Sequence, residues 1–366
     1  MSNDYVMHKG IASRQAHVDV PEGTFEEEHG RDGFFGPVSH LYRTHRPTDW
    51  TRIEGPLKPQ SFDGNKLNTK NEPLNRMALL QNSDVVLHIA KPIESMSYFF
   101  RNADGDEVYF IHQGQGVMET DFGPLFFKPG DYIVIPRGTT YRVLPETADN
   151  FFLIVESFSQ IRQPDRGMLG LHGLYDPAVI QTPSPSPIDE DGMEWEVRIK
   201  RQNAYTSVFY PFHPMDVVGW KGDLSVWQLS IHDICPVMSH RAHLPPSVHT
   251  TFLAKGFVIC SFVPRPFESA PGAERVPFYH RNIDYDEVLF YHDGQFFSRK
   301  GIGSGMITFH PQGIHHGPHP GAAESAAQET KTNEVAVMVD TQKPLMVTSE
   351  AEAIEWADYH KSWQVT

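Results

Sequence analysis

Cysteine is nearly absent from the sequence. Cys235 and Cys260 are the only two in 366 residues, and neither belongs to a CxxC pair. This excludes a disulfide framework or a thiolate metal site as the organising feature. Positive charge is also scarce, with 31 Lys and Arg against 46 Asp and Glu and a formal net charge of −15. Because phosphate binding needs a basic surface, we expect no nucleic-acid partner.

Long hydrophobic runs are missing as well. No apolar stretch approaches the roughly 20 residues that a membrane-spanning helix needs. The first ten residues, MSNDYVMHKG, also lack the apolar core of a signal peptide. We therefore expect no membrane partner and a cytoplasmic location.

Short β-branched and aromatic segments separated by turns are common in the chain. Examples are VVLHIA (85–90), EVYFIH (107–112), FVICSFVP (257–264) and EVLFYH (287–292). The 28 Gly and 29 Pro are scattered between such segments, as expected for many short strands joined by turns. The sequence predicts a fold dominated by β-strands.

Two segments of the chain are repeated. FRNADGDEVYFIHQGQG (100–116) matches HRNIDYDEVLFYHDGQF (280–296), and GDYIVIPRGTTY (130–141) matches GMITFHPQGIHH (305–316). The order is the same in both copies and the offsets are nearly equal. The repeat predicts two copies of one β-rich module.

The repeat and the composition together suggest boundaries along the chain. Residues 1–83 are polar and irregular, and we expect an N-terminal arm with outer strands. The first module is expected at 84–180 and the second at 193–366. Between them, QTPSPSPIDEDG (181–192) is typical of a linker. A C-terminal helix is expected over 348–363, with Ser349 as N-cap and Glu352 completing a capping box.

Histidine is abundant in the second copy, which resembles the two motifs of the cupin superfamily. Those motifs have the form H-x-H-x(3,4)-E-x(6)-G and G-x(5)-P-x-G-x(2)-H. The matching residues are His280, Asn282, Glu287 and Gly294, followed by Gly305, Pro311, Gly313 and His316. Asn282 stands where a second histidine usually lies. The resemblance implies a bicupin, with two tandem double-stranded β-helix (jelly-roll) barrels, in which His280, Glu287 and His316 share one metal.

The donor set of the second copy favours iron. Two histidines and one carboxylate leave three positions of an octahedron open, an arrangement typical of Fe(II) oxygenases. In the first copy, Phe100 and Tyr141 occupy the positions of the two histidines and Glu107 alone is retained. One carboxylate will not hold a transition metal, so the first barrel is expected to be structural.

Longer segments resemble homogentisate 1,2-dioxygenases, in particular their short bacterial form. They are HKG (8–10), EEEHGRDGFFGPVSHLYRTHRPTDW (26–50), YHRNIDYDEV (279–288), SRKG (298–301) and HHGPHPG (315–321). The resemblance implies an Fe(II)-dependent, extradiol-type ring cleavage of homogentisate by O2. The product would be maleylacetoacetate, in tyrosine and phenylalanine catabolism.

The same resemblance implies further site residues. His243 falls at the position of an acid–base histidine, although the neighbouring His240 and His249 are alternatives. His310, Phe296 and His316 are expected to contact substrate. His249, His315, His319 and Asn282 are candidates for orienting the ligands. Arg281, Arg299 and Lys300 are candidate partners for a substrate carboxylate. Cupins often associate through sheet edges and arms, so we also expect a homo-oligomer.

Two departures from the family pattern leave alternatives open. Phe296 stands where longer members carry a pocket tyrosine, and the spacing from His280 to Glu287 is one residue longer than theirs. A dioxygenase of the same fold acting on gentisate or a substituted hydroquinone is therefore an alternative. A manganese or zinc isomerase or decarboxylase is disfavoured by the missing second histidine. A non-catalytic bicupin that binds small molecules is disfavoured by the complete ligand set.

Overall fold

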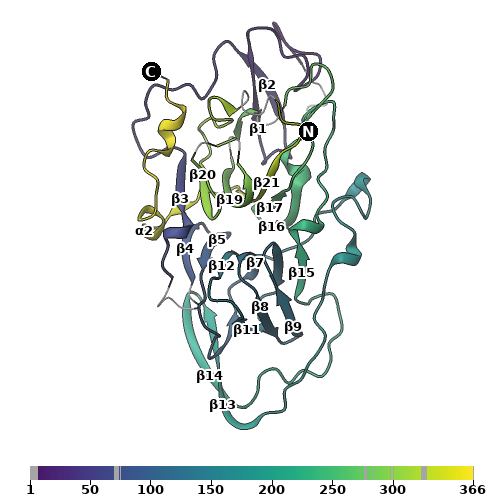
Figure 1. Ribbon diagram of the computed structural model, residues 1–366, viewed down its shortest axis with the longest axis vertical. Coiled ribbons are helices and arrows are strands. Elements are labelled where there is room, and N and C mark those ends of the chain that lie inside the picture. The colour runs from purple at the N-terminus through teal and green to yellow at the C-terminus, as the bar shows by residue number, and fades with distance from the viewer. Residues whose placement is uncertain are drawn as a thin grey trace.

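The structure is a computed structural model of two β-barrels stacked along the long axis (Figure 1). It describes residues 7–69, 74, 76–275, 278–282, 284–296, 298–299, 301–322 and 328–365, with only the backbone for Asp191 and Asn282. The expected β-dominated bicupin fold is confirmed. The metal-site candidates lie in the second barrel, in the upper half of Figure 1.

The first barrel consists of two sheets. One has seven strands in the order β15-β10-β7-β12-β5-β4-β22, and the other has six in the order β14-β13-β6-β11-β8-β9. The bounds are β4 (Arg76–Gln81), β5 (Val85–Ala90), β6 (Phe99–Asn102), β7 (Asp106–Gln113), β8 (Gly116–Thr120), β9 (Gly123–Phe127), β10 (Asp131–Ile135), β11 (Thr140–Pro145), β12 (Phe151–Ser157), β13 (Asp191–Arg201), β14 (Ala204–Phe212), β15 (Trp227–Ser230) and β22 (Met346–Val347).

The second barrel has a six-stranded sheet in the order β16-β17-β21-β19-β20-β3, and a three-stranded sheet, β18-β1-β2, forms its other wall. The bounds are β1 (Phe25–Gly30), β2 (Val38–Arg43), β3 (Gln60–Asp63), β16 (Thr250–Ala254), β17 (Phe257–Phe262), β18 (Tyr279–Asn282), β19 (Asp286–Gln295), β20 (Met306–His310) and β21 (Asn333–Thr341). Short 3-10 helices lie at Gly64–Lys66, Gly167–Leu169, Pro177–Val179, Ile231–Asp233, Pro246–His249 and Tyr359–Trp363.

Each barrel also contains strands from a segment outside its own pair of repeated motifs. In the second barrel, β1 pairs in parallel with β18, and β3 pairs with β20. In the first barrel, β13 pairs in parallel with β6, and β15 pairs with β10. The N-terminal segment is thus a wall of the second barrel rather than an outer arm. The strands between 191 and 230 belong to the first barrel, so the first barrel extends beyond the expected domain boundary at residue 193.

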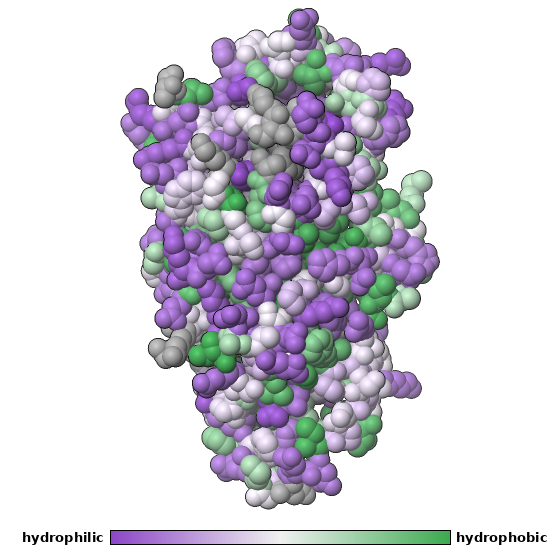
Figure 2. All heavy atoms as spheres, in the orientation of Figure 1, coloured by the Kyte–Doolittle hydropathy of each residue, from purple (hydrophilic) through white to green (hydrophobic). Residues whose placement is uncertain are grey.

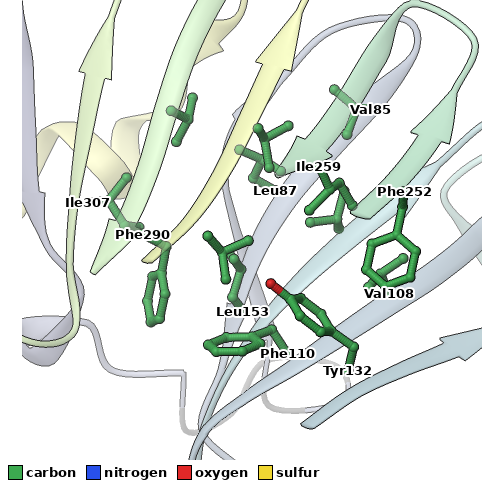
Figure 3. Close-up of a cluster of buried hydrophobic side chains, with 14 of the residues drawn as sticks. Val85, Leu87, Val108, Phe110, Tyr132, Leu153, Phe252, Ile259, Phe290 and Ile307 are labelled. Carbon is green, nitrogen blue, oxygen red and sulfur yellow. The ribbon is translucent and has the colours of Figure 1, made fainter. Parts of the chain in front are cut away.

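The core lies between the barrels because their large sheets are apolar on both faces. Along β7, Val108 and Phe110 point to the neighbouring barrel, while Tyr109 and Ile111 point into their own barrel. Figure 3 shows the shared cluster, in which Phe110, Tyr132 and Leu153 of the first barrel lie near Phe252 and Phe290 of the second. Packing across this cluster fixes the two barrels against each other.

The repeat is visible as a contact between equivalent residues. His112 and His292 lie 180 positions apart, and their Nδ1 atoms are 2.9 Å apart at the interface between the barrels. The two copies therefore meet face to face at the same position of the motif.

The metal motif of the first barrel is replaced by a buried polar network. Phe100 and Tyr141 are fully buried, in the positions of the missing histidines. Glu107 forms an ion pair with Arg76 and accepts a hydrogen bond from the Tyr141 hydroxyl at 2.7 Å. The retained carboxylate is thus neutralised by protein groups, in agreement with a structural role.

The expected C-terminal helix is wrong in extent and in its cap. The helix α2 spans only Ser349–Glu352, and its N-cap is Thr348, whose Oγ1 accepts from Ala351 N at 3.2 Å. The chain then pairs with the edge strand β3: Ile354 O accepts from Asp63 N, and Trp356 N donates to Ser61 O. These sheet-edge bonds end the helix, and a 3-10 turn (Tyr359–Trp363) follows.

Hydrophilic residues cover most of the face in Figure 2, with hydrophobic residues scattered among them. Among the described residues, no helix has the length and apolar character needed to cross a membrane.

Candidate metal centre and substrate cavity

His280, Glu287 and His316 converge inside the second barrel. Glu287 Oε2 lies 3.6 Å from His280 Nε2 and 3.5 Å from His316 Nε2. Two ligands of one ion, each about 2.1 Å from it, lie roughly 3 Å apart at right angles and somewhat further apart at wider angles. The three side chains, which we call the triad, therefore have the spacing of ligands around a common ion. Their binding of a metal stays a prediction.

Strand alternation and one backbone bridge place the triad. On β19, Val288 and Phe290 face the other barrel, so Glu287 points into its own barrel. His280 on β18 and His316 in the turn after β20 exchange two backbone hydrogen bonds, of 3.0 and 3.1 Å. This bridge holds the two imidazoles together, and their ring centroids are 3.9 Å apart.

The protonation states of Glu287 and His316 suit a metal. Burial raises the pKa of Glu287, but the nearby His316, His280 and His310 outweigh this effect and hold the pKa well below its usual value. Burial lowers the pKa of His316 to about 3. An ionised carboxylate and a neutral imidazole are the forms that bind metal ions.

The triad has buried imidazole nitrogens for which the protein supplies no hydrogen-bond partner. The Nε2 atoms of His280 and His316 are buried and have no hydrogen-bond partner. Buried polar atoms without partners are rare in folded proteins and are often ligands of an ion. The donor set of two imidazoles and one carboxylate fits a first-row divalent cation such as Fe(II).

A cavity opens onto His280 and Glu287 of the triad. Its lining combines two arginines, two histidines, two glutamates, a serine and a tyrosine with apolar side chains. The lining residues are His243, Pro246, Phe262, Arg265, Phe278, His280, Glu287, Leu289, Tyr291, Ser298, Arg299, Gly317, Glu334 and Met338. A largely apolar cavity with a few convergent polar groups beside a metal site is typical of a site for a small organic molecule.

Family models cover most of the chain. The N-terminal domain of homogentisate 1,2-dioxygenase matches residues 75–230, and the C-terminal domain matches residues 237–366. The chain belongs to the homogentisate 1,2-dioxygenase family. The first matched range ends at Ser230, where β15 completes the first barrel. The chain is therefore an enzyme of the dioxygenase class.

Relatives of this dioxygenase differ in length. A protein of Saccharolobus solfataricus named "Putative dioxygenase SSO1533" is 37% identical over 357 residues, 92% of each chain. The homogentisate 1,2-dioxygenase of Bradyrhizobium diazoefficiens is 28% identical over 280 residues, 72% of this chain but 62% of its own length.

A cupin 2 conserved barrel protein from Leptotrichia buccalis aligns over 77% of the chain with a TM-score of 0.36 and 10% identity.

Of the three neighbouring histidines in this dioxygenase, His243 is the one that lines the cavity. Its Nδ1 lies 3.6 Å from Glu268 Oε1, and its buried Nε2 has no hydrogen-bond partner. Burial lowers the pKa of His243, so the ring is neutral and can accept a proton. His240 is exposed, and His249 packs against Phe262 outside the lining.

The structure corrects the expected roles of His310 and Phe296. His310 is fully buried, with Nδ1 2.8 Å from Glu287 Oε1 and Nε2 3.1 Å from the Tyr359 hydroxyl. Both ring nitrogens are thus occupied by protein groups, so His310 orients a ligand instead of touching substrate. Phe296 packs behind Tyr291, with ring centroids 4.7 Å apart, and Tyr291 itself lines the cavity. A tyrosine is therefore present in the cavity despite the phenylalanine at 296.

The other candidates lie further from the triad. His315 Nε2 is 2.9 Å from Glu27 Oε1, and His319 Nδ1 is 2.9 Å from the carbonyl oxygen of Pro320. Arg281 Nε donates to His29 Nδ1 at 3.0 Å, outside the cavity lining. The side chain of Asn282 and all of Lys300 lie outside the described residues. Of the three proposed cations, Arg299 is the one that the structure places in the cavity.

Sequence reasoning missed four polar residues of the lining, namely Arg265, Tyr291, Ser298 and Glu334. Arg265 Nη1 and Arg299 Nε are buried without hydrogen-bond partners. Burial raises the pKa of Glu334, while Arg265 and Arg299 lower it. For Tyr291, period-two alternation from Glu287 was a usable signal, because residues four apart on a strand share a face.

Proposed function

We propose that this protein is an Fe(II)-dependent dioxygenase that cleaves the ring of homogentisate, giving maleylacetoacetate. The observation that supports this best is the buried triad of His280, Glu287 and His316 opening onto a cavity with two arginines. Bound Fe(II) would offer positions for both O2 and a phenolate oxygen, and would conduct electrons from the aromatic ring of the substrate to O2.

The protein would bind the acetate arm of the substrate through arginine. Arg265 and Arg299 both reach the cavity, and each has a buried nitrogen without a hydrogen-bond partner. A guanidinium group pairs well with a carboxylate because the two form parallel charge-assisted hydrogen bonds. A single carboxylate on the substrate therefore has two candidate partners in the cavity lining.

His243 would take the phenol proton. It is neutral, it faces the cavity, and its Nε2 is free of protein partners. Glu268, 3.6 Å from Nδ1, would favour the proton on that nitrogen and leave Nε2 as the acceptor. General-base help of this kind contributes about 10²–10⁴-fold to rate in enzymes.

The apolar lining would orient the ring and exclude water. Phe262, Phe278, Leu289 and Met338 flank the triad in the cavity. Exclusion of bulk water protects reactive oxygen chemistry from side reactions and strengthens the electrostatic contacts within the site.

Oxygen uptake with matched aromatics tests the substrate. The anaerobically Fe(II)-loaded protein is given homogentisate, gentisate or unsubstituted hydroquinone, and uptake is followed with absorbance of the product. We expect ring cleavage of homogentisate with the highest kcat/KM. Faster turnover of gentisate or hydroquinone would reject the proposed substrate while keeping the reaction type. A cytoplasmic location, a homo-oligomeric state and a role in tyrosine breakdown remain predictions.

A further inference from the structure

A second cluster of histidines and carboxylates lies beside the triad, and the proposed reaction does not use it. His17, Glu28 and His40 each offer a ligand atom, and these atoms lie within 4.8 Å of one another. His17, Glu26 and Glu274 form another such group around the same imidazole. We call these five residues the arm cluster.

Strand pairing brings the arm cluster to the triad. Glu26 and Glu28 are two residues apart on β1 and so share a face. Glu28 is paired with His40 on β2 on one side and with His280 on β18 on the other. His17 packs edge-on against His243, with ring centroids 5.4 Å apart. The cluster therefore adjoins one triad ligand and the candidate base.

The arm cluster concentrates buried negative charge. Glu26 is 1% exposed and Glu28 5% exposed, and His17 beside them is also 5% exposed. Burial lowers the pKa of His17, yet the nearby carboxylates of Glu274, Glu28 and Glu26 raise it to about 9. The carboxylates thus attract a positive charge to this point. Glu26 and Glu28 are both buried, and buried carboxylates are costly unless a cation compensates them. A metal ion bound by His17 would displace its proton and supply this compensation.

Atoms without partners point to a ligand. The buried His17 Nδ1, His40 Nδ1 and Glu26 Oε1 have no hydrogen-bond partner, although His40 Nδ1 and Glu26 Oε1 are 2.7 Å apart. His17 Nε2 lies 3.2 Å from Glu28 Oε2. This contact is a hydrogen bond, so the atoms left without partners are His17 Nδ1, His40 Nδ1 and Glu26 Oε1. The triad has the same feature, because the Nε2 atoms of His280 and His316 also lack partners.

We propose that the arm cluster is a second metal site, in which His17, Glu28 and His40 bind a first-row divalent cation and Glu26 and Glu274 supply further carboxylate oxygens. Imidazole with carboxylate suits Zn²⁺, Mn²⁺ or Fe²⁺, and no thiolate is present to restrict the choice. A bound ion would fix the His17 ring against which His243 packs. The role of this site is thus positioning, outside the reacting atoms.

Zinc binding by the full-length protein tests the proposal. Chelator-treated wild type is titrated with Zn²⁺, freed of excess metal by gel filtration, and analysed for zinc per chain. We expect two equivalents for wild type and one each for Glu28→Gln and Glu287→Gln. The matched control is Glu27→Gln on the same strand, because Glu27 pairs with Arg43 and His315 instead. It should keep both equivalents.

Anomalous diffraction at the zinc edge gives a second test that needs no variant and is therefore independent of how the variants fold. It uses wild-type crystals with saturating Zn²⁺. A peak among His17, Glu28 and His40 supports the site. A peak at the triad alone, or equal zinc uptake by wild type and Glu28→Gln, overturns the proposal. The triad is tested separately by Glu287→Gln, so failure here leaves the proposed function intact.

Discussion

His310 Nδ1 lies 2.8 Å from Glu287 Oε1, across the paired strands β19 and β20. Because burial keeps His310 neutral, its Nδ1–H donates to the carboxylate, and its Nε2 accepts from the Tyr359 hydroxyl. The C-terminal segment is thereby connected to a metal ligand through two hydrogen bonds. Partners of this kind set the orientation of a ligand and tune its affinity for metal.

Tyr359→Phe tests this connection. Removing the hydroxyl frees His310 to rotate and should weaken iron binding by about 10-fold or more, within the range found for partners of ligands. The measurement is the dissociation constant for Fe(II) under anaerobic conditions. Tyr132→Phe is the control, because it removes a buried hydroxyl bonded to Ser261 Oγ, away from the triad. Equal affinities in wild type and Tyr359→Phe would show that the connection has no effect on the metal.

His243→Gln tests the proposed base. We expect kcat to fall by about 10²–10⁴-fold, since a side chain of similar size that cannot take the proton remains. Bound iron should be unchanged, because His243 is not a ligand. His249→Gln, at a neighbouring buried histidine outside the cavity lining, should change kcat only slightly. If kcat fell more in His249→Gln than in His243→Gln, the base would be His249 instead of His243.

Arg265→Met and Arg299→Met test recognition of the acetate arm. A lost hydrogen bond to a charged group is worth about 1.5–3 kcal/mol, so KM for homogentisate should rise roughly 10–100-fold. KM for hydroquinone, which lacks the arm, should change little. Arg281→Met is the control, since Arg281 contacts His29 instead of the cavity. If all three variants raised both KM values equally, the arginines would be structural.

The contact between His112 and His292 predicts a loss of stability in acid. Burial lowers the pKa of His112 to about 3 and that of His292 to about 4. The unfolded chain therefore binds more protons than the folded one below pH ~6.5, so the free energy of unfolding should fall as the pH drops from there toward about 4.

Denaturant unfolding between pH 7 and pH 4 measures this effect. The double variant His112→Gln/His292→Gln should show a flatter dependence of stability on pH than wild type. His172→Gln, at an exposed histidine, should keep the wild-type slope. Identical slopes in wild type and the double variant would contradict the account of this interface.

The convergence of the triad was predictable from sequence because the spacing of its residues follows from local geometry. The eight residues from His280 to Glu287 and the turn ahead of His316 are each a strand-and-turn pattern. The equivalent positions of the first copy, Phe100, Glu107 and Tyr141, could be identified for the same reason. In contrast, the pairings of β1 with β18, β3 with β20, β13 with β6 and β15 with β10 join strands far apart in the chain, and no local pattern specifies them.

The directions in which side chains point were the other feature that the sequence did not predict. Alignment placed His310 and Phe296 in the cavity, yet Glu287 and Tyr359 occupy both nitrogens of His310, and Tyr291 stands in front of Phe296. Arg265 lies in an irregular segment after β17, where no periodicity indicates which way a residue points. The end of α2 was misjudged because the competing bonds to β3 come from residues almost 300 positions earlier.

The most direct test of the central claim compares Glu287→Gln with Glu107→Gln, the same substitution in the two copies of the motif. Both proteins are loaded with Fe(II) anaerobically, and bound iron and O2 uptake with homogentisate are measured. Glu287→Gln should lose one equivalent of iron and its O2 uptake. Glu107→Gln should keep both, while its free energy of unfolding falls by about 3–5 kcal/mol because Arg76 loses its buried partner. Wild-type iron content and O2 uptake in Glu287→Gln would contradict the account.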